Sequence, residues 1–248
     1  MTVLRHLSRV AMIPLAPVLL AQGRRLRRDT PRLPDAALPW HGSVAGERPL
    51  RLLVLGDSTA AGVGAETQHD ALPGHLARGL ATLTGRGVEW EAIGENGADA
   101  RELIEDYLDA ATERAYEVVL LSVGANDALG LRSRRAFGRD IRTILAALRD
   151  ASPDATIIVS SLPAFFRFVL LPQPLKWNLY LHSTSLEDEA RAIVARTPSA
   201  HMSPPPPPYT DGFFASDLFH PSSQGYRDWA DLALADAVRS GALPPASP

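Results

Sequence analysis

The sequence predicts an α/β fold in which a parallel sheet is covered by helices on both faces. From residue 50 to the end of the chain, short apolar runs alternate with segments of helical periodicity. Several of the apolar runs are continuous, which is typical of strands buried on both faces. Buried strands that alternate with amphipathic helices are the pattern of a three-layer α/β/α sandwich.

Four apolar runs are the predicted strands, at residues 51–55, 88–93, 118–121 and 156–159. The first, third and fourth runs are continuous, so we expect their strands to be buried on both faces. The second run alternates apolar and polar residues, and this pattern is typical of a strand nearer the edge of the sheet.

Five segments carry apolar residues at helical spacing, and they begin near residues 72, 99, 133, 184 and 222. Two of them open with a capping-box pattern, in which an N-cap side chain is followed three residues later by Glu. These pairs are Asp99 with Glu102 and Thr184 with Glu187. The pattern predicts that helices begin at Asp99 and at Thr184.

The composition excludes several classes of protein. Of the 248 residues, 46% are hydrophobic and 21% are charged, a mixture typical of a folded globular chain. The net charge of -3 argues against a protein that binds nucleic acid through its phosphates. The chain has no cysteine, so disulfides, thiolate nucleophiles and thiolate-bound zinc are excluded.

The first forty residues differ from the remainder in charge, because they contain seven arginines and two acidic residues. An apolar run at residues 10–21 is interrupted by Pro14 and Pro17, and it is shorter than the roughly 20 residues that span a membrane. A basic string at residues 24–28 follows it. Two interpretations stay open: an arm packed on the domain, and a segment within residues 1–32 that lies on an anionic membrane surface.

Prolines and glycines are frequent at residues 29–49, which predicts a linker. We therefore expect a basic, apolar extension with a linker at residues 1–49 and one domain at residues 50–248. No convincing signal-peptidase site follows the apolar run, so a cytoplasmic or membrane-associated location is favoured over cleaved secretion.

Parallel sheets bind ligands outside the carboxyl ends of their strands, so the residues just after each predicted strand are the candidates. Gly-Asp-Ser at residues 56–58 follows the first strand, and Gly-Glu-Asn-Gly at residues 94–97 follows the second. Gly-Ala-Asn-Asp at residues 124–127 follows the third strand. An Asp-x-x-His sequence stands at residues 217–220, near the end of the chain.

Together these four strings contain every group that acyl transfer needs. Ser58 is the candidate nucleophile, His220 the base that takes its proton, and Asp217 the acid that orients the imidazole. The oxyanion of the intermediate needs positioned donors, for which the candidates are the backbone N–H groups of Ser58 and Gly97 and the side-chain amide of Asn126. We expect the neighbouring Asp57 and Asp127 to stabilise turns, with Asp57 a weaker alternative as triad acid.

The four ordered strings resemble the SGNH hydrolase family of GDSL esterases and lipases, from about residue 50 to the C-terminus. Thr59 stands where the motif that names the family has Leu. Glu95 and Asn96 stand where small or hydroxylated residues are frequent, and Gly94 is the alternative to Gly97. The resemblance implies a flavodoxin-like sheet and hydrolysis of a small-molecule or lipid ester, or a thioester, without metal or cofactor.

An apolar segment at residues 162–182 leaves the carboxyl end of the fourth predicted strand. We expect it to border the site as a lid or acyl-binding wall, with Phe165, Phe166 and Trp177 contacting substrate; an ordinary core-packed loop is the alternative. Two other functions stay open: a carbohydrate O-deacetylase, and a non-catalytic binding or scaffold module that kept the fold.

Overall fold

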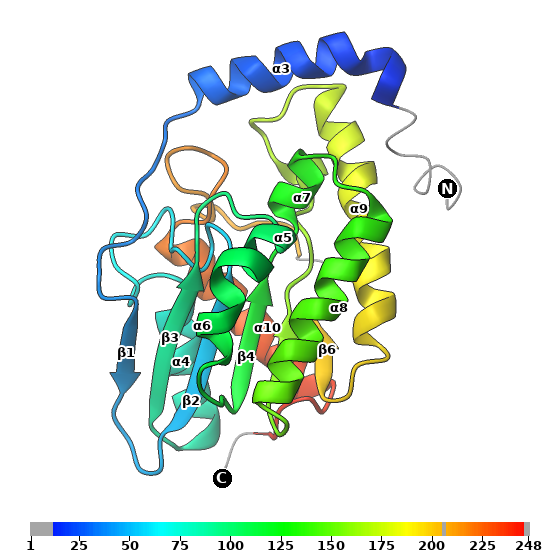
Figure 1. Ribbon diagram of the computed structural model, residues 1–248. Helices are drawn as coiled ribbons and strands as arrows, with labels where there is room; N and C mark the ends of the chain where they lie inside the picture. The colour runs from blue at the N-terminus through cyan, green and yellow to red at the C-terminus, as the bar shows by residue number, and fades with distance from the viewer. Residues whose placement is uncertain (1–11, 205–206, 246–248) are drawn as a thin grey trace.

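The computed structural model describes residues 12–204 and 207–245. In these residues, six strands form one sheet in the spatial order β1-β3-β2-β4-β5-β6 (Figure 1). The strands are β1 His41–Val44, β2 Leu50–Gly56, β3 Val88–Gly94, β4 Val118–Ser122, β5 Thr156–Val159 and β6 Ala200–Met202. All neighbours pair in parallel except β1 and β3. The five parallel strands have the flavodoxin-like order 2-1-3-4-5, so the predicted fold class is confirmed.

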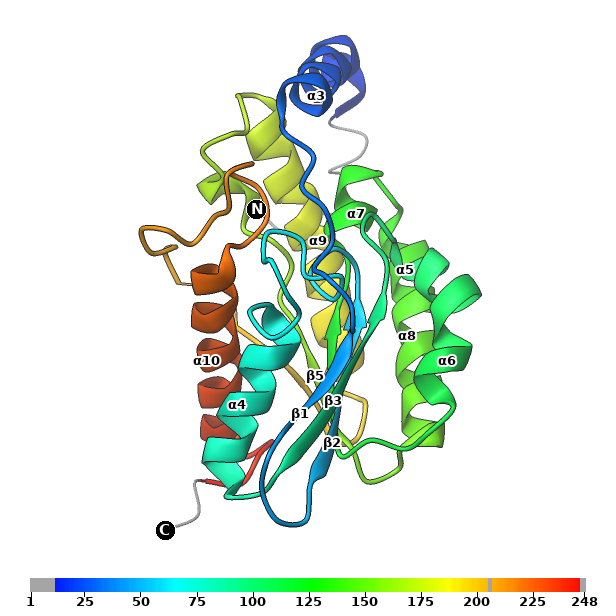
Figure 2. The ribbon, with the colours of Figure 1, turned by 90° about the vertical axis from the view of Figure 1, so that its left-hand side faces the viewer.

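Helices cover both faces of the sheet, as Figure 2 shows with the sheet on edge. One face carries α4 (Leu72–Thr84) and α10 (Ser223–Arg239). The other carries α5 (Ala100–Glu102), the π-helix η2 (Leu103–Tyr107), α6 (Leu108–Thr112), α8 (Arg134–Ala151) and α9 (Leu175–Val194). Short α7 (Ala125–Leu129) and the 3-10 helix η3 (Phe165–Arg167) lie near the carboxyl ends of the strands.

The central strand β2 shows why the chain folds into three layers. Leu53 and Leu55 belong to the apolar core on the α8 and α9 side, whereas Leu52 and Val54 belong to the core on the α4 and α10 side. Successive side chains of a strand point to opposite faces, so a continuous apolar run supplies both cores. All four side chains are almost fully buried.

The prediction of an unbroken linker at residues 29–49 is wrong in part. Residues 41–44 form β1, an antiparallel edge strand whose His41 lies opposite Glu91 of β3. Gly42 lies directly against the indole of Trp90, where a Cβ atom has no room. This four-residue strand contains one glycine and has no apolar alternation, so its pairing depends on β3 rather than on its own sequence.

Three of the predicted helix starts are confirmed by capping hydrogen bonds. Asp99 and Glu102 form the capping box, and the hydroxyls of Ser133 and Ser222 cap α8 and α10. The predicted start at Thr184 is wrong, because α9 begins at Leu175. The Thr184 hydroxyl donates to the carbonyl oxygen of Tyr180 at 2.8 Å, one turn back, which is how threonine is accommodated inside a helix.

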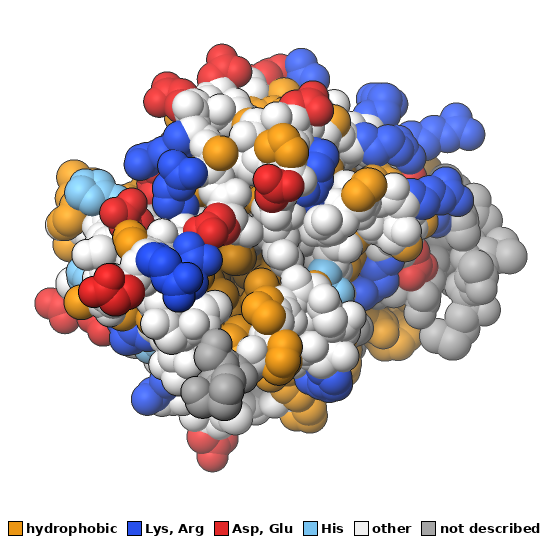
Figure 3. Space-filling model, turned by 90° about the horizontal axis from the view of Figure 1, so that it is seen from below, with side chains coloured by type: hydrophobic (Ala, Val, Ile, Leu, Met, Phe, Trp, Pro, Cys, Tyr) orange, Lys and Arg blue, Asp and Glu red, His pale blue; other side chains and the backbone are white. Residues whose placement is uncertain are grey.

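The N-terminal part of the described chain forms the 3-10 helix η1 (Ile13–Leu15) and helix α3 (Ala16–Asp29). Figures 1 and 2 show α3 crossing above the carboxyl ends of the parallel strands. At the opposite end of the molecule, acidic and basic side chains are interspersed (Figure 3). None of the helices described is both long enough and apolar enough to span a bilayer.

Candidate active site

The loops after β2 and β3 approach each other because their strands end in glycine. A Cβ atom on Gly94 would overlap the carbonyl oxygen of Gly56, and one on Gly56 would overlap that of Ser122. Gly94 also has a φ of +147°, which disfavours other residues. These glycines let the first two predicted strings lie side by side, next to the end of β4.

Ser58 lies two residues after the end of β2 and is 8% exposed. It lines a cavity of about 130 Å³ that is also lined by His220 from the loop before α10. Two residues 162 positions apart in the sequence therefore contact the same small volume. Hydroxyls of Thr59, Ser122 and Ser160 lie on its wall and form a hydrogen-bonded chain.

His220 is held by Asp217. The distance between His220 Nδ1 and Asp217 Oδ2 is 2.6 Å, and Asp217 Oδ1 accepts hydrogen bonds from the backbone N–H groups of Phe219 and His220 at 3.0 Å each. Leu218, between them, has a φ of +56°, a left-handed conformation that closes this turn within three residues. A spacing of three residues is therefore enough to place the carboxylate beneath the imidazole.

The Asp217 carboxyl group is buried, and burial by itself raises a carboxyl pKa. The hydrogen bonds from the His220 side chain and from the backbone N–H groups of Phe219 and His220 outweigh this effect, so the pKa of Asp217 is lower than usual. An ionised Asp217 accepts a hydrogen bond from the N–H at Nδ1 of His220, and this leaves Nε2 free to act as a base.

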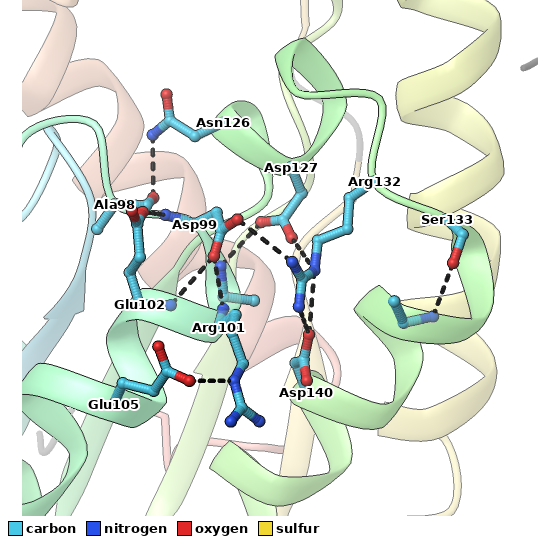
Figure 4. A network of polar contacts seen from close by, with 12 residues as sticks. Ala98, Asp99, Arg101, Glu102, Glu105, Asn126, Asp127, Arg132, Ser133 and Asp140 are labelled. Atoms are coloured by element: carbon cyan, nitrogen blue, oxygen red, sulfur yellow. Dashed lines mark hydrogen bonds and ion pairs between the residues drawn. The ribbon is translucent and has the colours of Figure 1, made fainter.

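Gly97 and Asn126, the two other predicted oxyanion donors, come from adjacent loops. The Asn126 side chain, on the first turn of α7, donates from Nδ2 to the carbonyl oxygen of Ala98 at 3.0 Å (Figure 4). Its amide carries a second N–H. Gly97 has a φ of +98° and lines a larger cavity of about 1170 Å³, which His220 also lines.

Asp127 links α7, which carries Asn126, to the start of α5, which follows the loop that carries Gly97. Its Oδ2 accepts the backbone N–H of Ala100 at 3.0 Å, and the Arg132 guanidinium lies between Asp127, Asp99 and Asp140 (Figure 4). Burial raises the pKa of Asp127 to about 7, although the bond from Ala100 opposes the shift. Its bond therefore spans 27 residues, beyond the turn-stabilising role that we expected.

Asp57 behaves as expected for a turn residue. Its Oδ1 accepts from the backbone N–H and the hydroxyl of Thr59, each at 3.1 Å. Burial raises the pKa of Asp57 to about 6, against the opposing effects of these bonds and of nearby His220. Asp217 forms a hydrogen bond with the His220 side chain and Asp57 does not, so the geometry favours Asp217 as the triad acid.

The structure does not bring the three predicted substrate-wall residues to the site. Phe165 is fully buried in the core, and Phe166 and Trp177 are 41% and 47% exposed and pack on Tyr180. None of the three lines either cavity. The apolar segment does border the site, but through other side chains: Phe168 at the small cavity, and Leu170, Leu171, Leu175 and Leu179 at the large one.

An aromatic group that we did not predict also lines the small cavity. Its members are Tyr209, Phe213, Phe214, Phe219 and Trp229. Four of them, Tyr209, Phe213, Phe214 and Phe219, lie within the eleven residues 209–219, which include Asp217. This density of rings around the Asp-x-x-His string was the available signal. These four rings pack against one another or on Phe168, with ring centroids 4.3 to 6.0 Å apart.

The model of the GDSL-like Lipase/Acylhydrolase family matches residues 54–227, a span that holds all four strings. The chain belongs to this family. A GDSL-like esterase of Mycobacterium tuberculosis is 28% identical over 204 residues, a match that covers 76% of this chain and 63% of that protein. The chain thus spans less than two thirds of the length of that curated relative.

Solved structures of a lipase/acylhydrolase and of a carbohydrate esterase share the fold. The lipase/acylhydrolase from Enterococcus faecalis is 21% identical, with a TM-score of 0.58 over 80% of this chain and 100% of that one. A carbohydrate esterase family 2 enzyme from Corynascus thermopiles is 15% identical, with a TM-score of 0.60 over 82% of this chain and 69% of that one. Within the described residues, no cluster of three metal-ligand side chains occurs.

Proposed function

We propose that this GDSL-family chain is a serine esterase that hydrolyses acyl esters or thioesters through an acyl-Ser58 intermediate. The observation that carries the proposal is the 2.6 Å bond between Asp217 and His220 at the wall of the cavity that Ser58 lines. A nucleophile, a base and an acid that orients the base are the minimum set for this chemistry.

In the acylation step, His220 Nε2 takes the hydroxyl proton of Ser58 while Oγ attacks the ester carbonyl carbon. The resulting oxyanion accepts hydrogen bonds from the N–H groups of Ser58 and Gly97 and from the second N–H of the Asn126 amide. The bond from carbon to the alcohol oxygen then breaks, and the alcohol leaves with the proton from His220. The acyl group remains as an ester of Ser58.

Deacylation repeats these steps with water in place of serine. His220 takes a proton from water, and the hydroxide attacks the acyl carbon. The bond to Ser58 Oγ breaks, and Oγ recovers the proton from His220. The products are a carboxylic acid and regenerated enzyme, with the same oxyanion donors used twice.

The lining of the two cavities supports acyl esters over the carbohydrate O-deacetylase alternative. Aliphatic side chains line most of the large cavity, and aromatic rings line much of the small one. Burial of apolar surface favours an acyl chain in such sites, whereas a polysaccharide needs many polar partners. A panel of p-nitrophenyl esters from acetate to palmitate, with wild type and Ser58→Ala, tests the function.

We expect hydrolysis by wild type and a rate at the background level for Ser58→Ala. A fluorophosphonate probe should label wild type and leave Ser58→Ala unlabelled. Equal label or equal rates in the two proteins would overturn the role of Ser58. Absence of label and of rate from folded wild type would favour the scaffold alternative.

We propose a membrane-associated location through residues 1–32, of which 1–11 lie outside the described residues. Ile13, Leu15 and Leu20 are 68%, 36% and 59% exposed, and four arginines follow within residues 24–28. Exposed apolar side chains beside arginines suit an anionic lipid surface. Sedimentation with phosphatidylserine vesicles at low salt, against phosphatidylcholine vesicles alone, tests this location; equal recovery in both would contradict it.

A further inference from the structure

The larger cavity is formed by segments that are far apart in the sequence. It measures about 1170 Å³, and His220 and Gly97 lie on its wall. Aliphatic side chains come from three regions: the α3 region with Leu19, Leu20 and Leu26, the α7 end with Leu129 and Leu131, and the segment before and within α9 with Leu170, Leu171, Leu175 and Leu179. The cavity therefore reaches from the proposed reaction site to the helix above the sheet.

Helix α3 is anchored over this cavity by a polar contact as well as by leucines. Gln22 Nε2 donates to the carbonyl oxygen of Gln173 at 2.7 Å, and Gln22 Oε1 accepts the backbone N–H of Leu175 at 3.2 Å. One side chain thus satisfies a donor and an acceptor at the start of α9. Leu19 is buried to 9% exposure beside this contact, whereas Val18 next to it is 47% exposed.

We propose that this cavity binds the chain of a long aliphatic acyl ester, and that α3 forms one wall of it and sets the preferred chain length. The inference rests on the proposed function. Residues 16–29 lie outside the span that the family model matches, so this wall is a feature of the chain beyond the shared domain. The carbon atom that carries the oxyanion is also the first atom of the acyl chain. Gly97, a proposed donor to that oxyanion, lines this cavity, so the chain begins close to the cavity wall.

The two cavities differ in volume and in lining, and both differences assign the acyl chain to the larger one. The small cavity measures about 130 Å³, against about 1170 Å³ for the large one, and beside its aromatic rings it has hydroxyls of Thr59, Ser122 and Ser160, which suit the alcohol or water. Leucine is the commonest residue on the wall of the large cavity, where Arg24, Arg27 and Arg32 also lie. Each methylene group transferred from water into such surroundings favours binding about fourfold, so kcat/KM should rise with chain length.

Leu19→Trp tests the wall, because an indole at this buried position fills space inside the cavity. Val18→Trp is the matched control, since it adds the same group to the exposed side of the same helix. For each protein, kcat/KM is measured with p-nitrophenyl acetate, octanoate, dodecanoate and palmitate. We expect the dodecanoate-to-acetate ratio to fall about tenfold or more in Leu19→Trp and to stay within about twofold of wild type in Val18→Trp.

Two results would overturn the inference: a wild-type preference for acetate over every longer ester, or the same ratio in Leu19→Trp as in wild type. Thermal melting of both variants confirms that the proteins compared are folded. Calorimetric titration with p-nitrophenyl dodecanoate supplies a readout besides activity. It compares the single variant Ser58→Ala with the double variant that also carries Leu19→Trp. If wild type hydrolyses no ester, the proposed function fails, and weaker binding of dodecanoate in the double variant still supports the acyl site.

Discussion

The side-chain amide of Asn126 lies 3.0 Å from the carbonyl oxygen of Ala98, the residue that follows Gly97. This bond joins the start of α7 to the loop after β3, so the segments that carry the two proposed oxyanion donors are held together. Asp127 supports the arrangement through its bond to Ala100. The geometry of the donors therefore depends on two adjacent residues: Asn126, which bonds to Ala98, and the buried Asp127, which bonds to Ala100.

Replacement of Asn126 should affect turnover rather than folding. Asn126→Ala removes both the proposed oxyanion donor and the bond to Ala98, and we expect kcat to fall about 10² to 10³-fold. Steady-state kinetics with p-nitrophenyl octanoate measures the loss. Arg135→Ala, at an exposed position on the next helix, α8, that lines neither cavity, serves as the control. A fall of less than threefold in Asn126→Ala would remove this residue from the oxyanion site.

Asp217→Asn should preserve shape but disturb the base. An amide at this position does not hold the imidazole with the proton on Nδ1 as a carboxylate does, so we expect kcat/KM to fall by about 10³ to 10⁴. Asp211→Asn, at an exposed position of the same loop, should behave as wild type. Activity of Asp217→Asn within tenfold of wild type would contradict the assignment of the triad acid.

The pH profile of activity should show an acid limb, because His220 acts as a base only when neutral. The pKa of Asp217 is lowered, so its carboxylate stays ionised over pH 5 to 8. Asp57 has a pKa of about 6 and interacts with the charge of His220, so it also changes charge in this range. Asp57→Asn should keep an acid limb with a shifted midpoint; a flat profile from pH 5 to 8 in wild type would contradict His220 as the base.

Stability should depend on pH through Asp127. Its pKa is about 7 in the folded protein against an ordinary value of 3.8, so the folded state favours the protonated form. The resulting stability is complete below pH 3.8 and is lost as the pH rises through about 7. Asp127→Asn removes this dependence, and the Tm of the variant relative to wild type should therefore be higher at pH 8 than at pH 4.5. Equal differences at the two pH values would contradict the raised pKa.

Local patterns were sufficient for the regular elements of the sheet core. Runs such as 52–55 and 118–121 are apolar at every position, and both lie in buried strands. Asp99 and Glu102 carry a capping signal within three residues, and Asp99 caps α5. The signal at Thr184 had the same form and failed, because the apolar residues that pack α9 begin before it and continue the helix through this position.

The sequence by itself determined the α/β class, the four strings at the strand ends and the short-range pair of Asp217 and His220, because these features depend on residues close together in the chain. Tertiary structure alone decided that Leu171 and Leu179, rather than Phe165 and Trp177, face the larger cavity. It also decided that α3 forms a wall of that cavity. The lining of a cavity depends on how distant segments pack against one another, and apolar residues of similar size carry no local mark of the side that they will face.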